Sequence, residues 1–269
     1  MKSLIINLES STERLAFQEK QFQKLGLSFE IMKAVSQEDL SQEEIETLSF
    51  GWERPLRSVE LACFMSHKKA WEFVVKHNEP ILILEDDALL SAHTKKILAS
   101  LETKNSCDLA TLEVRSRKKI VAKQGEQLST DHKIFALYQD RTGAAAYVLW
   151  PSGAKKLLDK VTYSKPALAD AFISSCYKLS AYQVEPAIAI QLDQCHAYDV
   201  TCMHSTNSTI SQYAKTSFKE LTLFSSILFR YRRIYSQFRM AFRQMSCLRV
   251  SYKREIAIHK DDFSSGDKA

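Results

Sequence analysis

The sequence predicts an α/β fold, in which helices flank a mixed, mostly parallel sheet and a helical appendage follows at the C-terminus. Short apolar runs alternate with segments of helical spacing along residues 1–212, the pattern of strand–helix units. Ile81–Leu84 is apolar at every position, as in a strand that is covered on both faces. From Tyr213 onward the composition becomes strongly basic, which indicates a separate task for that region.

The first half of the chain is expected to supply two strands and two main helices. Ser10-Ser11-Thr12-Glu13 has capping-box spacing, and Gly26 can cap the C-terminus of the helix that follows. In Glu60–His77 the apolar residues recur at helical spacing. The remaining elements expected here are a strand at Leu4–Leu8, a strand at Phe29–Met32, and a short helix and loop at Gln37–Leu48.

The second half continues the alternation after the strand at Ile81–Leu84. Pro151 suits the first position of a helix over Ser152–Lys160, because its missing N–H would lack a partner there anyway. The segment Arg115–Gln127 is basic and is expected to be irregular. Strands are expected at Asp108–Leu112, Ile134–Tyr138, Ala144–Trp150 and Ala187–Leu192.

Composition bounds the function. The 269 residues are 45% hydrophobic and 26% charged, enough to bury a core, and six glycines and five prolines exclude collagen-like architectures. No apolar run approaches the ~18 residues that span a bilayer, and the first residues do not form a signal peptide, so a cytoplasmic protein is expected. The cysteines contain no C-x-x-C pair and are expected to be free thiols.

Three consecutive carboxylates, Glu85, Asp86 and Asp87, follow the apolar run Ile81–Leu84. Ligands of open α/β sheets bind where such strands end. Carboxylates crowded there would repel one another unless a cation lay between them, and Mg²⁺ or Mn²⁺ carrying phosphates is a suitable one. The alternative is a solvated acidic turn. Neither a Walker A loop nor G-x-G-x-x-G is present, so phosphates would be held by metal and side chains.

Four sequence blocks, in order, resemble glycosyltransferase family 25, the lipooligosaccharide galactosyltransferase family. A weaker fifth block holds Asp170 and Pro186–Gln191, and together they cover roughly residues 3–210. The sequence departs from the family pattern at Leu15, Val59, Ala62 and Ala144. The four blocks are Ile5–Leu8 with Ser11, Glu13 and Arg14; Glu60–Glu72; Ile83–Ala88; and Gly143–Val148 followed by Gly153–Leu158.

The resemblance implies a GT-A-like catalytic domain over residues 1–212 that uses a nucleotide-sugar donor. It implies an inverting enzyme that depends on Mn²⁺ or Mg²⁺, with UDP-galactose as the favoured donor and UDP-glucose or a UDP-N-acetylhexosamine as alternatives. The acceptor implied is a terminal sugar of lipooligosaccharide, which would receive a β-linked hexose.

The same resemblance suggests roles for individual residues. Asp87 is the expected metal ligand, joined by His196 or by Asp193. Asp170 is the expected catalytic base, because an ionised residue among apolar neighbours requires a reason, with Glu185 in reserve and a helix N-cap as the alternative. Trp71 is expected in the core. The expected donor-binding residues are Asn7, Arg14, Ser66, His67, Glu85 and Asp86, of which Arg14 and His67 have equally plausible structural roles.

The C-terminal region, residues 213–260, is expected to be a basic amphipathic helical segment. From Tyr213 onward there are twelve Lys/Arg and five Asp/Glu, a net charge of +7, against +5 for the whole chain. An aromatic stripe interspersed with arginines predicts peripheral binding to the anionic inner-membrane surface. The alternative is a helical subdomain packed on the core with its arginines in solvent. Residues 261–269 are expected to be disordered.

Two rival functions use the same residues. A metal-dependent nuclease or phosphatase could use Glu85, Asp86 and Asp87, with the basic tail on nucleic acid. The tail mixes its arginines with a full apolar stripe, however, so no nucleic-acid partner is expected. The second rival is a non-catalytic glycosyltransferase-like scaffold.

Overall fold

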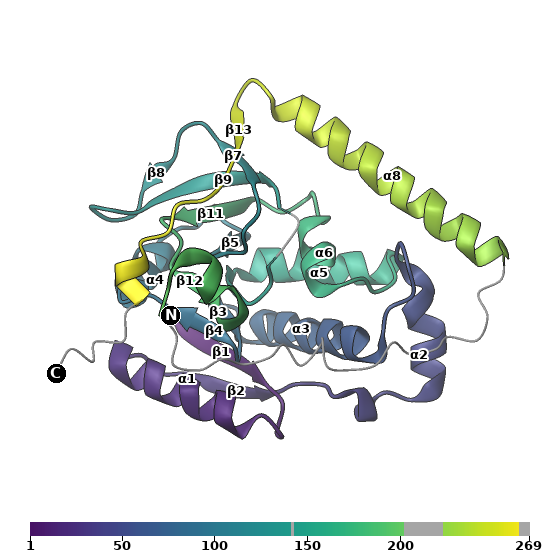
Figure 1. Cartoon of the computed structure of the whole chain (residues 1–269), viewed down its shortest axis with the longest axis horizontal. Helices are drawn as coiled ribbons and strands as arrows, with labels where there is room; N and C mark the ends of the chain where they lie inside the picture. Colours follow the sequence, from purple (N-terminus) through teal and green to yellow (C-terminus); the bar gives the residue numbers. More distant parts are fainter. Residues whose placement is uncertain (141–142, 202–222, 264–269) are drawn as a thin grey trace.

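A large mixed sheet forms the centre of the molecule (Figure 1). The computed structural model describes residues 1–140, 143–201 and 223–263. Within them the strand order is β13-β7-β9-β11-β5-β10-β3-β1-β2, and β8 pairs with β9. The ten strands are β1 (Lys2–Asn7), β2 (Glu30–Lys33), β3 (Ile81–Glu85), β5 (Leu109–Thr111), β7 (Lys119–Ala122), β8 (Glu126–Gln127), β9 (Lys133–Gln139), β10 (Ala146–Leu149), β11 (Ala181–Glu185) and β13 (Ser251–Arg254).

The expected mixed, mostly parallel sheet is confirmed in strand direction. Seven of the ten strands in the described part of the chain run one way, and β9, β10 and β13 run the other way. These three strands lie next to strands of the opposite direction, so only β1–β2, β1–β3 and β5–β11 are parallel neighbours. In particular, β10 separates β3 from β5 and pairs antiparallel with both.

Helices cover both faces of this sheet and bury alternate residues of each central strand. On β3, Ile81 and Ile83 pack in the cluster that includes side chains of α3 (Ser58–His77), α5 (Pro151–Tyr163) and α6 (Ala169–Ser174). Leu82 and Leu84 pack on the opposite face with α1 (Thr12–Leu25) and α4 (Thr94–Glu102). Burial on both faces explains why the β3 sequence is continuously apolar.

A second, three-stranded sheet of order β4-β12-β6 stands beside the end of β3. Its strands are β4 (Ala88–Leu90), β12 (Ala189–Gln191) and β6 (Glu113–Val114). The chain passes from β3 through the turn Asp86-Asp87 directly into β4. The small sheet therefore brings the ends of β6 and β12 close to the acidic turn.

Most of the expected helix ends are found. Gly26 caps α1 in the left-handed conformation (φ 59°), and Pro151 opens α5. The expected capping box at Ser10–Glu13 is wrong, because Ser11 is the N-cap and its side chain makes no capping hydrogen bond. The expected helix and loop before α3 is η1 (Gln37–Asp39), α2 (Gln42–Leu48) and η2 (Ser49–Gly51).

The segment Arg115–Gln127, expected to be irregular, contains β7 and β8 instead. Ile120 and Val121 are buried, and the buried Lys119 ammonium donates to Asp140 at 2.6 Å and to the Gln183 side-chain oxygen at 2.7 Å. The basic composition of the segment predicts an exposed loop rather than a buried strand. Lys119 can be buried because its hydrogen-bond partners come from distant parts of the sequence.

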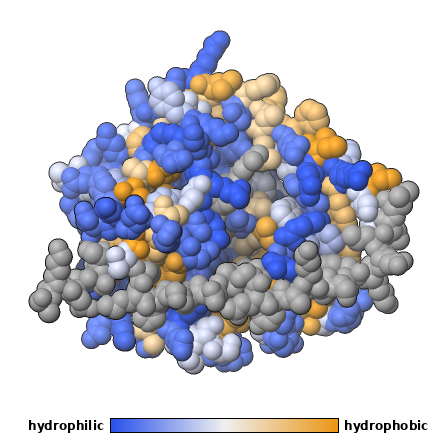
Figure 2. Space-filling model, in the orientation of Figure 1, coloured by the Kyte–Doolittle hydropathy of each residue, from blue (hydrophilic) through white to orange (hydrophobic). Residues whose placement is uncertain are grey.

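The C-terminal region is helical as expected, but it also returns to the main sheet. α8 (Leu223–Cys247) runs along the outside of the molecule, where Figure 2 shows apolar and hydrophilic residues interspersed. β13 then pairs antiparallel with β7, so describing residues 213–260 as a purely helical region is wrong. Residues 261–263, expected to be disordered, lie in η4 (Lys260–Phe263) with Phe263 buried. The rest of that tail, like residues 213–222, lies outside the described residues.

Two further expectations concern cysteines and membrane spans. Cys63, Cys107, Cys176, Cys195 and Cys247 are free thiols as expected, and Cys202 lies outside the described residues. None of the helices in the described ranges combines the length and the apolar character that crossing a membrane requires.

Candidate active site

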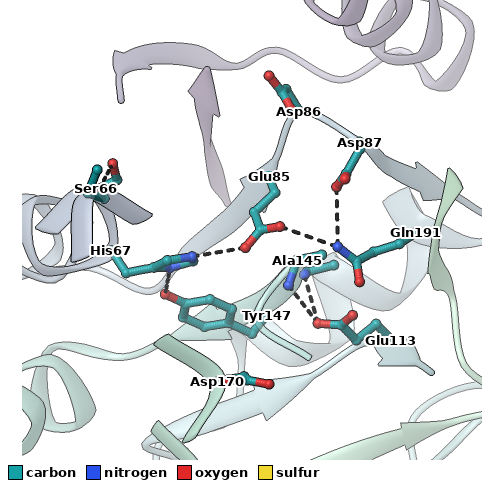
Figure 3. A network of polar contacts seen from close by, with 12 residues as sticks. Ser66, His67, Glu85, Asp86, Asp87, Glu113, Ala145, Tyr147, Asp170 and Gln191 are labelled. Atoms are coloured by element: carbon teal, nitrogen blue, oxygen red, sulfur yellow. Dashed lines mark hydrogen bonds and ion pairs between the residues drawn. The ribbon is translucent and has the colours of Figure 1, made fainter. Parts of the chain in front are cut away.

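The acidic turn after β3 points its three carboxylates in two directions (Figure 3). Glu85 and Asp87 both accept hydrogen bonds from the Gln191 side-chain amide, at 3.3 and 3.4 Å. Asp86 points away from both and is held by Asn7 at 2.8 Å and Arg14 at 3.0 Å. The expectation that all three carboxylates crowd around one cation is therefore wrong.

Asn7 and Arg14 position Asp86 from the first strand–helix unit. Asn7, the last residue of β1, also donates to the carbonyl oxygen of Ser11 at 3.2 Å, which ties the strand end to the start of α1. Arg14, in the first turn of α1, also lies 3.7 Å from Asp87. One arginine thus neutralises part of the charge on two neighbouring carboxylates.

A buried hydrogen-bond chain reaches Glu85 from behind. The Trp71 indole N–H donates to the Tyr147 hydroxyl at 3.0 Å, and that hydroxyl lies 3.0 Å from His67 Nδ1. The hydroxyl accepts from Trp71 and therefore has its own proton available for a hydrogen bond to Nδ1. Nε2 lies 3.1 Å from Glu85 and donates to it. Trp71 is fully buried, as expected of a core residue.

The surroundings shift the pKa values of the paired carboxylates, Glu85 and Asp87, in opposite directions. Burial would raise the pKa of Glu85, but the hydrogen bond and charge of His67, with Arg115 and Arg14, lower it below its usual range. Burial and then the charge of Glu85 raise the pKa of Asp87 to about 7, although Arg14 opposes them. Near neutral pH the pair therefore holds between one and two negative charges, and a bound cation would favour both carboxylates in the ionised form.

Two cavities meet at these residues. The α1–α3 cavity, of about 860 Å³, is lined by residues including Ser11, Arg14, Val35, Cys63 and Glu85. The α6 cavity, of about 1150 Å³, is lined by residues including Asp87, Arg115, Asp170, Gln191 and Asp193. Arg14, Cys63 and Glu85 line both. The two cavities therefore form adjoining compartments on either side of Glu85.

Asp170 lies on the wall of the α6 cavity, in the first turn of α6. Its carboxylate accepts the Ala171 N–H at 2.7 Å. Burial raises its pKa, although that hydrogen bond opposes the change. A half-buried carboxylate with a raised pKa, facing a cavity that also holds Glu85 and Asp87, has the chemistry of a general base.

Several expected site residues have other roles or positions. Ser66 borders the α1–α3 cavity, but its hydroxyl accepts from the Val35 N–H at 2.8 Å and donates to the Ala62 carbonyl oxygen at 2.9 Å, so it joins α3 to the chain after β2. His196 is exposed on η3 (Leu192–Tyr198) and lines neither cavity, so the structure does not bring it to Asp87. Asp193, which lines the α6 cavity, is paired with Arg115 at 3.1 Å.

Glu185, the reserve base, is paired with Arg254 and accepts the Ala257 N–H at 2.7 Å. It lines neither of the two cavities. Its contacts fasten the C-terminal segment to β11, and the expectation of a catalytic role is wrong.

Two sets of side chains could hold a cation. Glu85 and Asp87 offer carboxylate oxygens around one amide group, which suits Mg²⁺ or Mn²⁺. Cys63, His67 and Glu85 each offer one atom within 4.8 Å of the others, a set suited to a softer ion. Burial raises the pKa of the Cys63 thiol, so it is protonated and a poor ligand near neutral pH. The donor set that fits the expected hard cation is therefore Glu85 with Asp87.

Sequence reasoning missed three residues of this site: Tyr147, Gln191 and Glu113. Gln191 ends an apolar run and Glu113 interrupts one, and a polar residue in such a run is the available signal for a buried functional group. Gln191 and Glu113 lie on the small sheet, whose three strands are each three residues or shorter. Strands of that length leave little periodicity to detect.

An α/β sheet with paired carboxylates beside two cavities at a strand end is typical of an enzyme active site, and comparison with known proteins gives the family. The model of glycosyltransferase family 25 (LPS biosynthesis protein) matches residues 1–173, and the chain belongs to this family. The lipooligosaccharide biosynthesis protein lic2B of Haemophilus influenzae is 28% identical over 233 residues, which are 81% of this chain and 86% of that protein. The lacto-N-neotetraose biosynthesis glycosyltransferase LgtE of Neisseria gonorrhoeae is 28% identical over 208 residues, or 71% and 74% of the two chains.

Solved structures resemble the chain more distantly. A Drosophila β-1,4-galactosyltransferase 7 variant in complex with manganese, UDP-Gal and xylobiose aligns over 81% of each chain with a TM-score of 0.38 and 9% identity. The inositol-1-phosphate CTP transferase of T. maritima aligns over 71% of this chain and 88% of its own, with a TM-score of 0.39 and 12% identity.

Proposed function

We propose that this glycosyltransferase moves a hexose, with galactose from UDP-galactose as the favoured case, onto a terminal sugar of lipooligosaccharide with inversion at the anomeric carbon. The observation that carries the proposal is the meeting of two cavities at Glu85, with Asp170 on the wall of one of them. Family membership supports the substrate class, as do the two bacterial relatives, which are named for lipooligosaccharide and lacto-N-neotetraose biosynthesis. Membership of this family also favours glycosyl transfer over the nuclease or phosphatase alternative.

The two compartments suit the two parts of the reaction. The α1–α3 cavity would take the nucleotide, and the sugar would extend past Glu85 into the α6 cavity. There Asp170 would accept the proton of the acceptor hydroxyl while that oxygen attacks the anomeric carbon from the face opposite the leaving group. The bond from the anomeric carbon to the phosphate oxygen breaks as the new glycosidic bond forms, and the electron pair leaves with UDP.

The departing diphosphate needs charge stabilisation, which nearby residues can provide. Glu85 and Asp87 would hold Mn²⁺ or Mg²⁺, which supplies Lewis-acid stabilisation of the leaving group when bound. Arg14 contacts Asp86 and lines both cavities, so its guanidinium lies between the nucleotide and sugar compartments. Arg115 lines the α6 cavity and adds positive charge on that side.

The test uses purified enzyme with UDP-galactose, Mn²⁺ and an oligosaccharide acceptor, and NMR of the product. We expect a β-linked galactoside from the wild type. In Asp170→Asn we expect kcat to fall by about 10² to 10⁴, as for loss of a general base, with binding of UDP unchanged. An α-linked product, or an Asp170→Asn variant with wild-type kcat, would contradict the proposal. A wild type that binds UDP and Mn²⁺ but never transfers would favour the scaffold alternative.

We also propose that α8 binds the anionic membrane surface that would carry a lipid-linked acceptor, at the inner face of the inner membrane. α8 faces the protein body with arginines: Arg232 donates to the Phe50 carbonyl oxygen at 2.6 Å, and Arg239 and Arg243 stack on Tyr177. Its apolar stripe faces outward, the reverse of the packed-subdomain alternative. The exposed members of the stripe are Phe224, Ile227, Tyr231, Ile234, Tyr235, Phe238, Phe242 and Met245.

The charge of α8 favours a membrane over a second copy of the chain. Three of its five arginines contact the protein body, but Arg230 and Arg233 are exposed and the helix has no carboxylate, so two copies facing each other would bring positive charge to positive charge. Anionic lipid would instead attract the arginines while the stripe enters the headgroup region.

A further inference from the structure

Glu113 is a buried acid directly behind the paired carboxylates. It lies on β6 and is 1% exposed. Its Oε1 accepts the Ala145 N–H at 2.7 Å and the Ala146 N–H at 3.2 Å. The carbonyl oxygen of Ala145 in turn accepts the backbone N–H of Glu85 at 2.8 Å. Glu113 therefore holds the same short segment that holds the end of β3.

Gly143 lies between the carboxyl group of Glu113 and the α6 cavity. Gly143 lines that cavity, and a Cβ added to it would lie 2.7 Å from the carboxyl carbon of Glu113. Its φ of 101° is also a conformation that other residues avoid. Glycine is therefore required here both by its backbone conformation and by the carboxyl group of Glu113.

Two buried oxygens in this region, Glu113 Oε2 and Gln191 Oε1, have no hydrogen-bond partner among the residues that the structure describes. In Figure 3 the side-chain oxygen of Gln191 points toward the carboxyl group of Glu113. Burial raises the pKa of Glu113 to about 8, with Glu85 and Asp140 raising it and Lys119 lowering it. At neutral pH the carboxyl is therefore neutral, and a neutral acid can accept through one oxygen and donate through the other.

We infer that Glu113 is a positioning residue for the Glu85–Asp87 pair, acting through Ala145 and through the amide of Gln191. The O–H of the neutral Glu113 carboxyl group would donate to the side-chain oxygen of Gln191. That hydrogen bond would orient the Gln191 amide so that its N–H group faces Glu85 and Asp87. This role deepens the proposed function, on which it rests, because the pair that it positions is the proposed cation and donor site.

The test compares Glu113→Leu, Glu113→Gln and wild type by Mn²⁺ titration and by the NMR resonances of the Gln191 side-chain amide and the Ala145 backbone amide. Leu cannot accept or donate, whereas Gln keeps an acceptor for the two N–H groups and a donor toward Gln191. We expect Mn²⁺ affinity to fall by about 10- to 100-fold in Glu113→Leu, as for other residues that orient metal ligands. We expect Glu113→Gln to restore it to within about threefold and to keep both resonances near their wild-type positions.

Asp108→Asn is the matched control, because Asp108 is a buried acid that accepts the Ser180 N–H at 2.7 Å and lines neither cavity. If Glu113→Leu does not fold, Glu113→Asp takes its place, since its shorter side chain cannot keep both contacts. Wild-type resonances and Mn²⁺ affinity in a folded Glu113→Leu or Glu113→Asp would overturn the inference. A wild type that binds no Mn²⁺ would instead overturn the proposed cation site, and the two resonances would still decide the role of Glu113.

Discussion

At the scale of single residues, the site is a set of carboxylates whose neighbours give each a different charge. His67 donates to Glu85 and lowers its pKa, whereas burial and the nearby charge of Glu85 raise the pKa of Asp87 to about 7. Asp86 is held apart by Asn7 and Arg14. Three adjacent residues of nearly identical chemistry thus acquire distinct roles from the direction in which each side chain points.

The raised pKa of Asp87 predicts how a cation should bind. Below about pH 7 the cation must displace a proton from Asp87, so its affinity should fall by up to about tenfold per pH unit. Above that pH the affinity should level off. Calorimetric titration of Mn²⁺ from about pH 5.5 to 8.5, in buffers of different ionisation enthalpy, measures both the affinity and the released proton.

Asp87→Asn is the matched variant for this titration. It should bind Mn²⁺ more weakly at every pH, with a flatter pH dependence, because the titrating ligand is gone. Equal slopes in wild type and variant would assign the pH dependence to another group, and the account of Asp87 would fail.

At the scale of elements, the long and periodic segments follow the sequence closely, and the short ones do not. β3, α3 and α5 were expected because their apolar patterns extend over five to twenty residues. β6 and β12 have only two and three residues. β7 contains the buried Lys119, whose hydrogen-bond partner Gln183 is distant in the sequence, so the sequence does not reveal this strand. Asp87 and Asp170 could be proposed as site residues from the sequence, and both line the α6 cavity. Gln191 and Glu113 could not, because they lie on strands of the small sheet that are too short to detect.

α8 gives a prediction at this scale. Replacing both Phe238 and Phe242 with serine should weaken binding to anionic vesicles by at least about tenfold. The reason is that burying each aromatic side chain in the membrane contributes roughly 1.5–3 kcal/mol to the free energy of binding. Sedimentation with phosphatidylglycerol vesicles and with neutral phosphatidylcholine vesicles measures the effect. Tyr163→Ser, an exposed aromatic residue on α5, is the control.

Substitution is a sharper test than removal of the C-terminal region. Truncation before α8 would also delete β13, which pairs with β7, and Arg254, which pairs with Glu185. A double variant that sediments like the wild type would contradict membrane binding through α8. A change in its oligomeric state, with no lipid binding by the wild type, would assign the stripe to a second copy instead.

At the scale of the whole molecule, the chain places two adjoining cavities on either side of the acidic end of β3, with the candidate base Asp170 on the wall of one of them. The sequence could predict the α/β class and the position of the acidic turn, because these follow from local patterns and block order. It could not predict that Asp86 turns away from its neighbours or that the C-terminal segment returns to the sheet. Both depend on contacts between residues about seventy or more positions apart.

The most direct test of the central claim is hydrolysis of a panel of UDP- and GDP-sugars without acceptor, with Mn²⁺ and with EDTA, by wild type and Asp87→Asn. The account predicts slow release of UDP from UDP-galactose that requires Mn²⁺, is abolished by EDTA and is lost in Asp87→Asn. Release of UDP that is equal with EDTA and unchanged in Asp87→Asn would contradict a cation-dependent donor site at the end of β3.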